Sequence, residues 1–312
     1  MTPLSQSVAG QVVECVPNFS EGADPERVKA IIAAMRVDGV RLLDWSMHAE
    51  HNRSVVTIAG EPNAVIEAAV RGAGRAAELI DLNVQEGQHP RIGAADVIPF
   101  APVAGIRLEQ CALLARQAGL EIWRRFGIPI YFYEAAAARP DRANVDEIRR
   151  DQFEGLRDIV RKDASRRPDV GGPGLHPTAG ACAVGARKFL VTYNIYFDSG
   201  DVAMARAIAK EIRASGTGKG VKALGALVHG RAQLAMNITD YERTPISEVF
   251  AKVSKLAAKH KTAPIEGEVI GLIPEAACER ESEWMRQLRE FDPAARILER
   301  RLENPLAWPE KA

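Results

Sequence analysis

The sequence predicts an α+β protein made of two similar lobes, each a two-layer α/β unit of the split-βαβ type (βαββαβ, ferredoxin-like). Two observations predict this class. The same order of strand and helix patterns occurs twice within the 312 residues, and the apolar residues of the helix patterns fall on one face. We place the N-terminal lobe, with its linker, at residues 1–180 and the C-terminal lobe, with a charged helical tail, at 181–312. A ligand cleft is expected between two such lobes.

The first half of the chain reads strand, helix, strand, strand, helix, strand. Residues 12–19 alternate in polarity, and Asp24 and Pro25 then supply a helix cap and a proline in the first turn. The remaining elements are expected as strands at 40–45 and 54–60, a helix from Pro62, and a strand at 96–103. A helix at 108–126 and a strand at 128–134 extend this lobe.

The second half repeats the order. A long strand is expected at 186–197, and Asp201 caps a helix that carries Met204, Ile208 and Ile212 on one face. Residues 221–228 and 231–238 predict a hairpin, a helix begins at Pro245, and residues 267–273 form the last strand. The tail from Glu275 alternates charged and apolar residues, which is typical of helices that pack on the outside of a protein or on a partner subunit.

Residues 155–180 are interpreted as the linker between the lobes. They begin with basic residues and end in a segment, 171–180, with four glycines and two prolines. Such a segment exposes backbone N–H and C=O groups to anything that docks there. We therefore expect its last part to be a shaped loop.

Composition limits the function. The 41 Lys and Arg residues balance the 41 Asp and Glu residues, so no overall charge favours nucleic acid or a membrane surface, and a small-molecule ligand is expected. No apolar run has the roughly 20 residues that span a bilayer, and the four cysteines form no CxxC pair. These features predict a cytoplasmic protein with reduced thiols.

His89 lies in a constrained turn, between Gly87 and Pro90, in the stretch GQHPRIGAADVIPF. Glycine and proline restrict the backbone there, so the imidazole is expected to be held in place, which suits proton transfer near neutral pH. The alternative is a turn histidine hydrogen-bonded to backbone, and the sequence does not decide between them. Arg91 is expected to pair either with a ligand carboxylate or with Asp96.

Two short stretches have similar sequences, HPRIGA at 89–94 and HPTAGA at 176–181, and each precedes a strand. They indicate either matched turns of two related lobes that line one cleft or a chance recurrence. Near the first, His48 and His51 could hold zinc together with His89, but no HExxH helix or cysteine ligand supports this, and no metal is expected. Asn52 and Arg53 could meet a carboxylate or the polar edge of a heterocycle.

Four segments together resemble the formiminotransferase family. They are VECVPNFSEG at 13–22, HNRSVVTIAG at 51–60 after LLD, GQHPRIGAADVIPFAPV at 87–103, and HPTAGACAVGARKFLVTYNI at 176–195. The resemblance extends from about residue 13 to residue 273, and it implies the form of the enzyme that stands alone without a cyclodeaminase half. It implies two similar α/β lobes with folate between them, and a homodimer.

The resemblance also implies the activity, which is transfer of the formimino group from N-formimino-L-glutamate to N5 of tetrahydrofolate, a step of histidine breakdown. Tetrahydrofolate is the implied co-substrate. Two alternatives stay open: a glutamate formyltransferase that uses N-formylglutamate, and a non-catalytic protein that binds folate or an amino acid. Transfer between two small molecules would need neither nucleic acid nor a membrane.

The catalytic histidine of the family falls on His89, where it would act as general acid and base. The folate-binding segment falls on Gly171, Gly172, Pro173, Gly174, Leu175, His176, Pro177, Thr178, Ala179 and Gly180. Candidates for contacts with the glutamate substrate are Asp44, Glu50, Asn52, Arg53, Arg91 and Arg187.

One departure concerns the carboxylate that assists His89. The fused vertebrate enzymes have an acidic residue two positions after the aspartate of LLD, where this chain has Ser46. The assisting group is therefore Glu50, Asp44 or Asp96, and the sequence does not choose among them.

Overall fold

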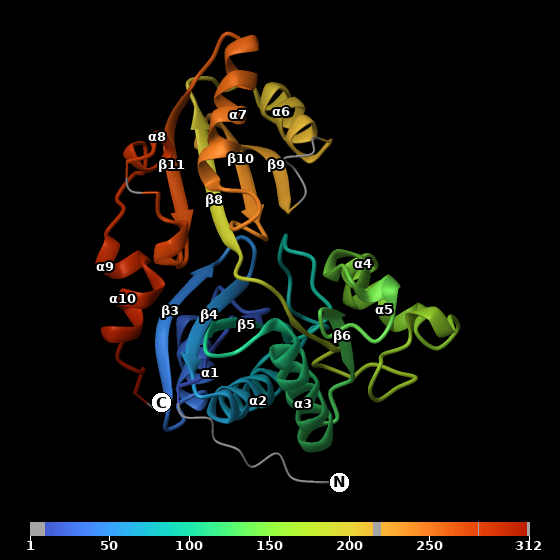
Figure 1. Cartoon of the computed structure of the whole chain (residues 1–312). Coiled ribbons are helices and arrows are strands. Elements are labelled where there is room, and N and C mark those ends of the chain that lie inside the picture. The colour runs from blue at the N-terminus through green and yellow to red at the C-terminus, as the bar shows by residue number, and fades with distance from the viewer. Residues whose placement is uncertain (1–9, 215–219, 280, 311–312) are drawn as a thin grey trace. The chain divides into compact units, whose positions relative to one another are not determined.

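The computed structural model describes residues 10–214, 220–279 and 281–310 (Figure 1). The chain divides into two compact units, residues 1–187 with 305–312, and residues 188–304. This division falls between Arg187 and Lys188, seven residues after the position at which we separated the lobes. The reason is strand β7 (Cys182–Ala186), which pairs within the sheet of the first unit.

The first unit contains the expected βαββαβ order. Its first strand is broken at Pro17 into two parts, and the elements are β1 (Val12–Cys15), β2 (Asn18–Phe19), α1 (Pro25–Ala34), β3 (Val40–His48), β4 (Arg53–Gly60), α2 (Pro62–Leu79) and β5 (Ala95–Ala104). Both β1 and β2 pair with β4 on one side and β5 on the other, and β3 pairs with β4, all antiparallel. The Asp24 side chain accepts bonds from the N–H groups of Glu26 and Arg27, which confirms the predicted cap of α1.

A parallel extension widens this sheet to seven strands. After β5 the chain forms α3 (Leu108–Phe126) and β6 (Ile130–Glu134), and β7 is inserted between β5 and β6, parallel to both. The segment between β6 and β7 contains α4 (Val145–Arg149), α5 (Gln152–Ile159) and the 3₁₀ turns Pro140–Arg142 and Ala164–Arg166.

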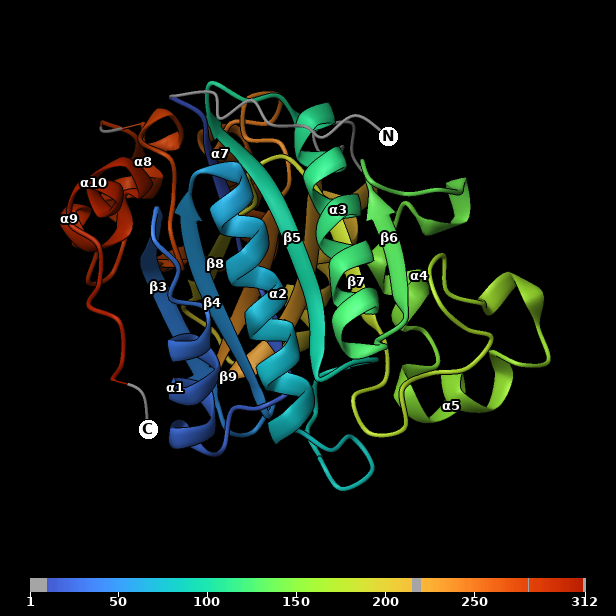
Figure 2. The ribbon, with the colours of Figure 1, turned by 90° about the horizontal axis from the view of Figure 1, so that it is seen from below.

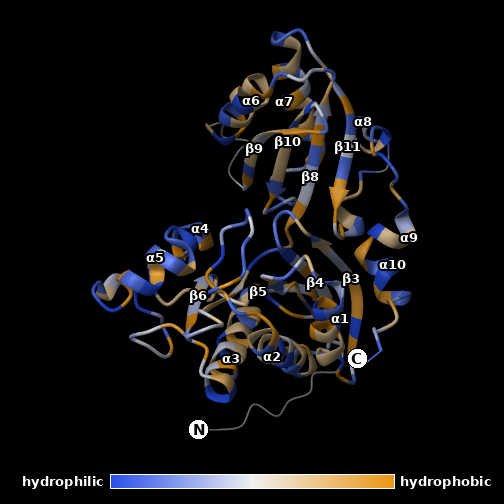
Figure 3. Cartoon of the chain, turned by 180° about the vertical axis from the view of Figure 1, so that it is seen from behind, coloured by the Kyte–Doolittle hydropathy of each residue, from blue (hydrophilic) through white to orange (hydrophobic). Residues whose placement is uncertain are grey.

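The two faces of the seven-stranded sheet are covered by different helices. Figure 2 shows α1, α2 and α3 lying across one face, where they bury alternate strand residues such as Val13, Cys15, Ile130 and Phe132. Tyr131 and Tyr133 point the other way, into a second cluster with Ile148 and Leu156 of α4 and α5. These two helices show hydrophilic residues along the rest of the ribbon (Figure 3). The start of β5 meets α4, because Asp96 pairs with Arg149.

The second unit has the same order of elements as the first, and its own sheet has the corresponding strand order. Its elements are β8 (Val191–Phe197), α6 (Val202–Ala214), β9 (Val221–Val228), β10 (Arg231–Ile238), α7 (Ile246–Lys259) and β11 (Pro264–Ile270), with strand order β11-β8-β10-β9. In the first unit the corresponding order is β5, then β1 with β2, then β4 and β3. The two βαββαβ units therefore share one antiparallel topology, which confirms the predicted fold class.

Two local predictions in this unit are also confirmed. Asp201 accepts bonds from the N–H groups of Ala203 and Met204 and so caps α6. The β9–β10 hairpin turns at His229 and Gly230, both with positive φ, as a two-residue turn of this kind requires. The tail forms the 3₁₀ turn Glu275–Ala277 and the helices α8 (Glu283–Arg286), α9 (Pro293–Arg296) and α10 (Leu298–Glu303), and it buries Trp284 against Tyr193.

Two sequence interpretations are wrong. The strand expected at 186–197 is two strands, because Ala186 ends β7 and β8 begins only at Val191. Residues 155–180 do not link the units, since they lie wholly within the first unit as part of α5, a 3₁₀ turn and the loop before β7.

Candidate functional site

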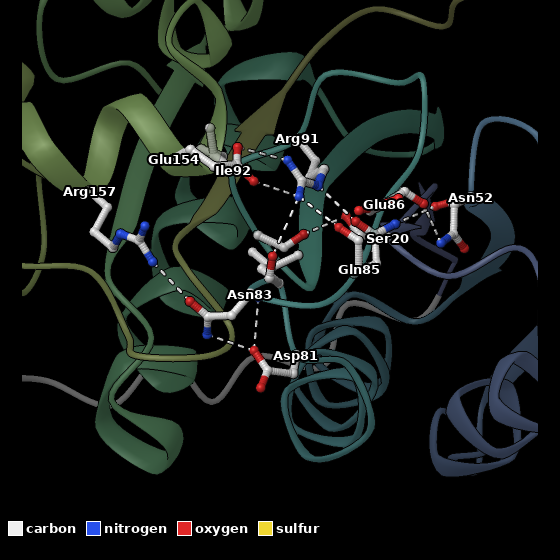
Figure 4. Close-up of polar contacts among 12 residues, drawn as sticks. Ser20, Asn52, Asp81, Asn83, Gln85, Glu86, Arg91, Ile92, Glu154 and Arg157 are labelled. Atoms are coloured by element: carbon white, nitrogen blue, oxygen red, sulfur yellow. Dashed lines mark hydrogen bonds and ion pairs between the residues drawn. The ribbon is translucent and has the colours of Figure 1, made fainter.

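One amide side chain helps to hold the turn that carries His89. Asn52, directly before β4, accepts a bond from the N–H of Gly22 (2.9 Å) and donates one to the carbonyl of Glu86 (2.7 Å), as Figure 4 shows for the second contact. Gly87 lies so close that a Cβ atom there would be 2.5 Å from the carbonyl oxygen of His51. The segments around residues 22, 52 and 87 are therefore packed together, and this explains why glycine precedes the histidine turn.

His89 itself is partly buried, and its Nε2 atom is enclosed without a hydrogen-bond partner among the described residues. Burial and, after it, the cations Arg53 and Arg149 together lower the pKa of His89 to about 3, while Asp96 acts in the opposite direction. At neutral pH the ring is thus an uncharged imidazole. The alternative of a histidine tied to backbone has no support at Nε2, which has no hydrogen-bond partner among the described residues.

A buried ion network lies beside this ring. Asp96, 2% exposed, accepts the N–H of Ile92 through Oδ1 (2.9 Å), and its Oδ2 pairs with Nη2 of Arg149 and lies 3.5 Å from Nη1 of Arg53. Arg53 also donates to Oδ1 of Asn18. Burial lowers the pKa of Arg53 to about 10, and repulsion by Arg149 acts in the same direction. Two cations therefore share one carboxylate next to the imidazole.

The three carboxylates proposed to assist His89 lie in different places. Asp96 belongs to the network just described and raises the pKa of His89. Glu50 is exposed in the turn between β3 and β4, where its carbonyl accepts a bond from the N–H of Gln88 (3.3 Å). Asp44 is half-buried on β3, opposite Thr57. Of these three carboxylates, Asp96 is the one whose charge acts on His89.

Arg91 is part of a separate network. Its Nη1 and Nη2 atoms donate to the Glu154 carboxylate (3.0 and 2.8 Å), and its Nε and Nη2 donate to the side chain and carbonyl of Gln85 (2.7 and 2.9 Å) (Figure 4). The bonds from Arg91 hold the pKa of Glu154 below its usual value. Arg91 is 7% exposed. Its guanidinium, expected to pair with Asp96 or with a ligand carboxylate, anchors the turn to α5 through Glu154.

The two proline turns of similar sequence, 89–94 and 176–181, lie side by side in the first unit. Gly93 and Gly180 form an antiparallel bridge, and the N–H groups of Ala94 and Ala181 donate to the carbonyls of Ala179 and Ile92 (3.0 and 2.9 Å). The interpretation as matched turns of two lobes is therefore wrong, because both turns lead into adjacent parallel strands, β5 and β7, of one sheet.

Within the Gly-rich loop 171–180, His176 has a structural role. Its Nδ1 accepts the N–H of Ala179 (3.0 Å), and its backbone exchanges two bonds with Gly180 (2.8 and 3.1 Å). Burial lowers the pKa of His176. Gly171 lies against the Trp123 ring, whereas Gly172 and Pro173 are exposed. The exposed half of the loop is the part that could receive a ligand.

Arg187 directly follows β7, and its N–H donates to the carbonyl of Phe100 (2.9 Å). Its charge acts on Glu14 of β1, a residue that the sequence analysis missed. Burial raises the pKa of Glu14 to about 7, and Arg187 partly offsets this effect. Glu14 is 2% exposed and lies in the middle of the sheet.

Arg149 is the second residue that the sequence analysis missed. It is the last residue of the short helix α4 and lies 53 positions after Asp96. No motif distinguishes it from the many arginines around it, and only the packing of α4 on the sheet brings it to His89.

Other features limit the chemistry of the site. The ring of His51 lies between those of His48 and His89. Its centroid is 6.2 Å from that of His48 and 6.5 Å from that of His89. Within the described ranges no group of three His, Cys, Asp or Glu side chains could hold a metal ion.

None of the described helices is long and apolar enough to cross a membrane. A pocket of about 320 Å³ lies nearby, lined by Asn52, Glu86 and several acidic residues, and His89 does not line it.

Comparison with known proteins finds two family matches. Residues 12–187 match the formiminotransferase domain, N-terminal subdomain, and residues 192–292 match the formiminotransferase domain. The chain is 41% identical to "Glutamate formimidoyltransferase" of Thermoplasma acidophilum and 40% identical to the protein of that name from Streptococcus pyogenes serotype M1. Each alignment covers 94% of this chain, and 98% and 99% of the relative. "Formimidoyltransferase-cyclodeaminase" of Mus musculus is 34% identical over 93% of this chain and 59% of that protein.

Proposed function

Because the chain belongs to the formiminotransferase family, we propose that it transfers the formimino group of N-formimino-L-glutamate to N5 of tetrahydrofolate. Relatives at about 40% identity over nearly their whole length carry the name glutamate formimidoyltransferase. Tetrahydrofolate is then a co-substrate, and the expected setting is histidine breakdown in the cytoplasm. The expected homodimer stays a prediction.

His89 is the proposed general acid and base. N5 of tetrahydrofolate attacks the formimino carbon, a carbon–nitrogen bond forms, and the proton of N5 passes to Nε2 of His89. The tetrahedral intermediate then loses the glutamate nitrogen, which takes the same proton from the imidazolium as its bond to carbon breaks. Proton transfer of this kind contributes about 10²- to 10⁴-fold to a rate, so alignment of the two substrates supplies much of the remainder.

The observation that carries this proposal is the unpartnered Nε2 atom of a neutral His89 beside Asp96, Arg53 and Arg149. A base must be uncharged before it accepts a proton, and burial together with the two cations keeps the ring in that form. Asp96 offsets part of their charge, which stabilises the imidazolium when it forms. Asp96 is therefore the proposed assisting carboxylate, in the absence of an acid at Ser46.

The proposed folate site is the loop 171–180. Its exposed half, with Gly172 and Pro173, presents backbone donors and acceptors that could pair with the polar edge of a pterin ring. Gly174 lies next to the guanidinium of Arg161, which would contact the acidic end of the folate. Arg53 and Arg187 stay candidates for the carboxylates of the glutamyl donor, and Asn52 supports the turn that positions His89.

Direct assay tests the proposal. The protein is incubated with N-formimino-L-glutamate and tetrahydrofolate, and formation of 5-formiminotetrahydrofolate is measured. His89→Ala is expected to lower kcat by about 10²- to 10⁴-fold with little change in folate affinity. His260→Ala, at the exposed end of α7, is the matched control and should have wild-type kcat.

The outcomes separate the alternatives. Product from N-formyl-L-glutamate but not from the formimino donor would identify a formyltransferase. Tight folate binding without transfer from either donor would refute the proposed reaction, and wild-type kcat in His89→Ala would exclude His89 from the mechanism.

A further inference from the structure

The ion network beside His89 contains more positive than negative charge. Two guanidinium groups, Arg53 and Arg149, face the single carboxylate of Asp96, which leaves a surplus of one positive charge. Their side chains are only 19% and 11% exposed, so water screens this surplus poorly. An uncompensated charge in such a place is costly, and a bound anion would remove the cost.

The hydrogen-bonding groups of the network are also incompletely used. Nε of Arg149 is enclosed and has no partner in the described part of the chain, and the same holds for Nε2 of His89. A guanidinium offers five N–H donors, and Arg53 directs its donors to the side-chain oxygens of Asn18 and Asp96. The network thus carries surplus charge, and Arg53 and Arg149 keep 19% and 11% of their side chains exposed, where an acidic ligand could reach them.

On the basis of the proposed function, we infer that Arg149 and Arg53 together bind one carboxylate of the glutamyl donor, on either side of Asp96 and next to His89. Arg149 is the determining residue of this carboxylate subsite. Removing its charge would leave Arg53 and Asp96 as a balanced pair with no surplus for an anion.

The chemistry favours a carboxylate over other acceptors. A planar guanidinium presents paired donors that match the two oxygens of a carboxylate, and one monoanion balances a surplus of one charge. Phosphate would bring additional negative charge close to the buried Asp96. The folate ring, which is uncharged, would leave the surplus in place.

Occupation of this subsite would also change His89. The groups that act on its ring are Arg53 of β4, Arg149 of α4, Asp96 of β5 and His51 of the β3–β4 turn. A carboxylate bound to the two arginines cancels part of their repulsion and raises the pKa of His89 from about 3 toward its ordinary range. The donor would thereby make its own base stronger, which prevents proton uptake before the substrate is present.

Kinetics of three variants test the subsite. Arg149→Gln is expected to raise KM for N-formimino-L-glutamate by about 10- to 100-fold, the usual range for a charged hydrogen bond, and to leave KM for tetrahydrofolate unchanged. Arg149→Lys keeps the charge and should recover part of the loss. Arg150→Gln, the adjacent and exposed arginine, is the control and should behave as the wild type.

Binding of glutarate, measured by calorimetry, tests the subsite without catalysis. Glutarate is expected to bind the wild type and Arg150→Gln equally, and to bind Arg149→Gln about 10- to 100-fold more weakly. Asp96→Asn enlarges the positive surplus, so it should bind glutarate more tightly than the wild type. A residue with only a structural role would not produce a gain.

The two sets of results separate the inference from the proposed function. Glutarate binding that depends on Arg149, in a protein without transfer activity, would keep the subsite and overturn the proposed reaction. The subsite would be overturned if the enzyme is active and the Arg149→Gln variant binds glutarate and the donor normally, with circular dichroism showing that the variant is folded. If Arg149→Gln does not fold, Arg149→Lys decides. The inference is overturned if Arg149→Lys has an unchanged donor KM and an unchanged glutarate affinity, and if Asp96→Asn binds glutarate no more tightly than the wild type.

Discussion

Gly93 and Gly180 lie opposite each other in an antiparallel bridge that joins the turn before β5 to the turn before β7. The backbones approach so closely that a Cβ atom on Gly93 would be 1.9 Å from the carbonyl oxygen of Ala181, and one on Gly180 would be 2.1 Å from that of Ile92. The turn that follows His89 and the Gly-rich loop are thereby held in one arrangement. The proposed base and the proposed folate loop thus depend on the same contact.

Gly93→Ala is expected to destabilise the protein by about 1–3 kcal/mol or more, because the added methyl group overlaps backbone that side-chain rotation does not relieve. The free energy of unfolding in urea measures the effect. Gly127→Ala is the comparison, since Gly127 has a φ of 64° but open space around its Cβ position, and only the backbone cost of about 1–2 kcal/mol applies. A smaller loss in Gly93→Ala than in Gly127→Ala would contradict the close approach.

Arg91→Met should lower stability and leave KM for the glutamyl donor unchanged. The reason is that Arg91 is committed to Glu154 and Gln85, and the lost bonds are expected to cost about 1–3 kcal/mol. Thermal unfolding and donor KM are measured on the same preparation. Glu154→Gln should cost less, because the Glu154 side chain is 55% exposed. A raised donor KM with unchanged stability would instead make Arg91 a substrate contact.

Glu14 predicts a dependence of stability on pH. Its pKa is about 7 in the folded protein against 4.5 for an ordinary glutamate, because burial disfavours the carboxylate. The folded state therefore holds the proton more tightly, and this contribution to stability is complete below pH 4.5 and is lost as the pH rises through 7. Over that range the loss is on the order of 3 kcal/mol.

Glu14→Gln removes the titrating group, so its stability relative to the wild type should increase between pH 5 and pH 8. Urea unfolding at both values measures the difference. His89 has a lowered pKa and therefore destabilises the wild type as the pH falls below 6.5, so the comparison must be made variant against wild type at each pH. An equal difference at pH 5 and pH 8 would show that Glu14 does not titrate in this range.

Gly171→Ala tests the folate loop. Gly171 has a φ of 80°, and a Cβ atom there would be 2.7 Å from the Trp123 ring, so the substitution should displace the exposed half of the loop. The expected result is a higher KM for tetrahydrofolate with an unchanged KM for the glutamyl donor. Gly230→Ala has a similar φ of 77° without any neighbour within 4 Å, and it should leave both constants unchanged. An effect on donor KM alone would argue against folate at this loop.

Much of the fold could be predicted because its causes are local. Proline and aspartate caps, the spacing of apolar residues on helices, and alternation in strands together predicted both βαββαβ orders. The errors arose where local pattern does not decide pairing. Residues 182–186 and 191–197 both have strand character, and only hydrogen bonding to β5 and β6 assigns the first of them to the other unit.

The candidate site was predictable only in part. The restricted turn at His89 can be read from Gly87 and Pro90, which act on their neighbours in the chain. The identity of its charged neighbours could not be read, because Arg149 is one of many arginines, and nothing in its surroundings marks it as a partner of Asp96. Arg91 shows the converse, since a residue two positions from His89 turns away to bind Glu154.

The sequence by itself determined the class of the fold, its internal repetition and the position of the constrained histidine, because these depend on periodicity and on backbone restrictions within short segments. The tertiary structure decided which cations surround that histidine, which carboxylate balances them, and that the two proline turns are neighbours in one sheet. Charge pairing inside a protein depends on distance and burial in three dimensions, and α4 brings Arg149 to Asp96 across 53 positions of the chain.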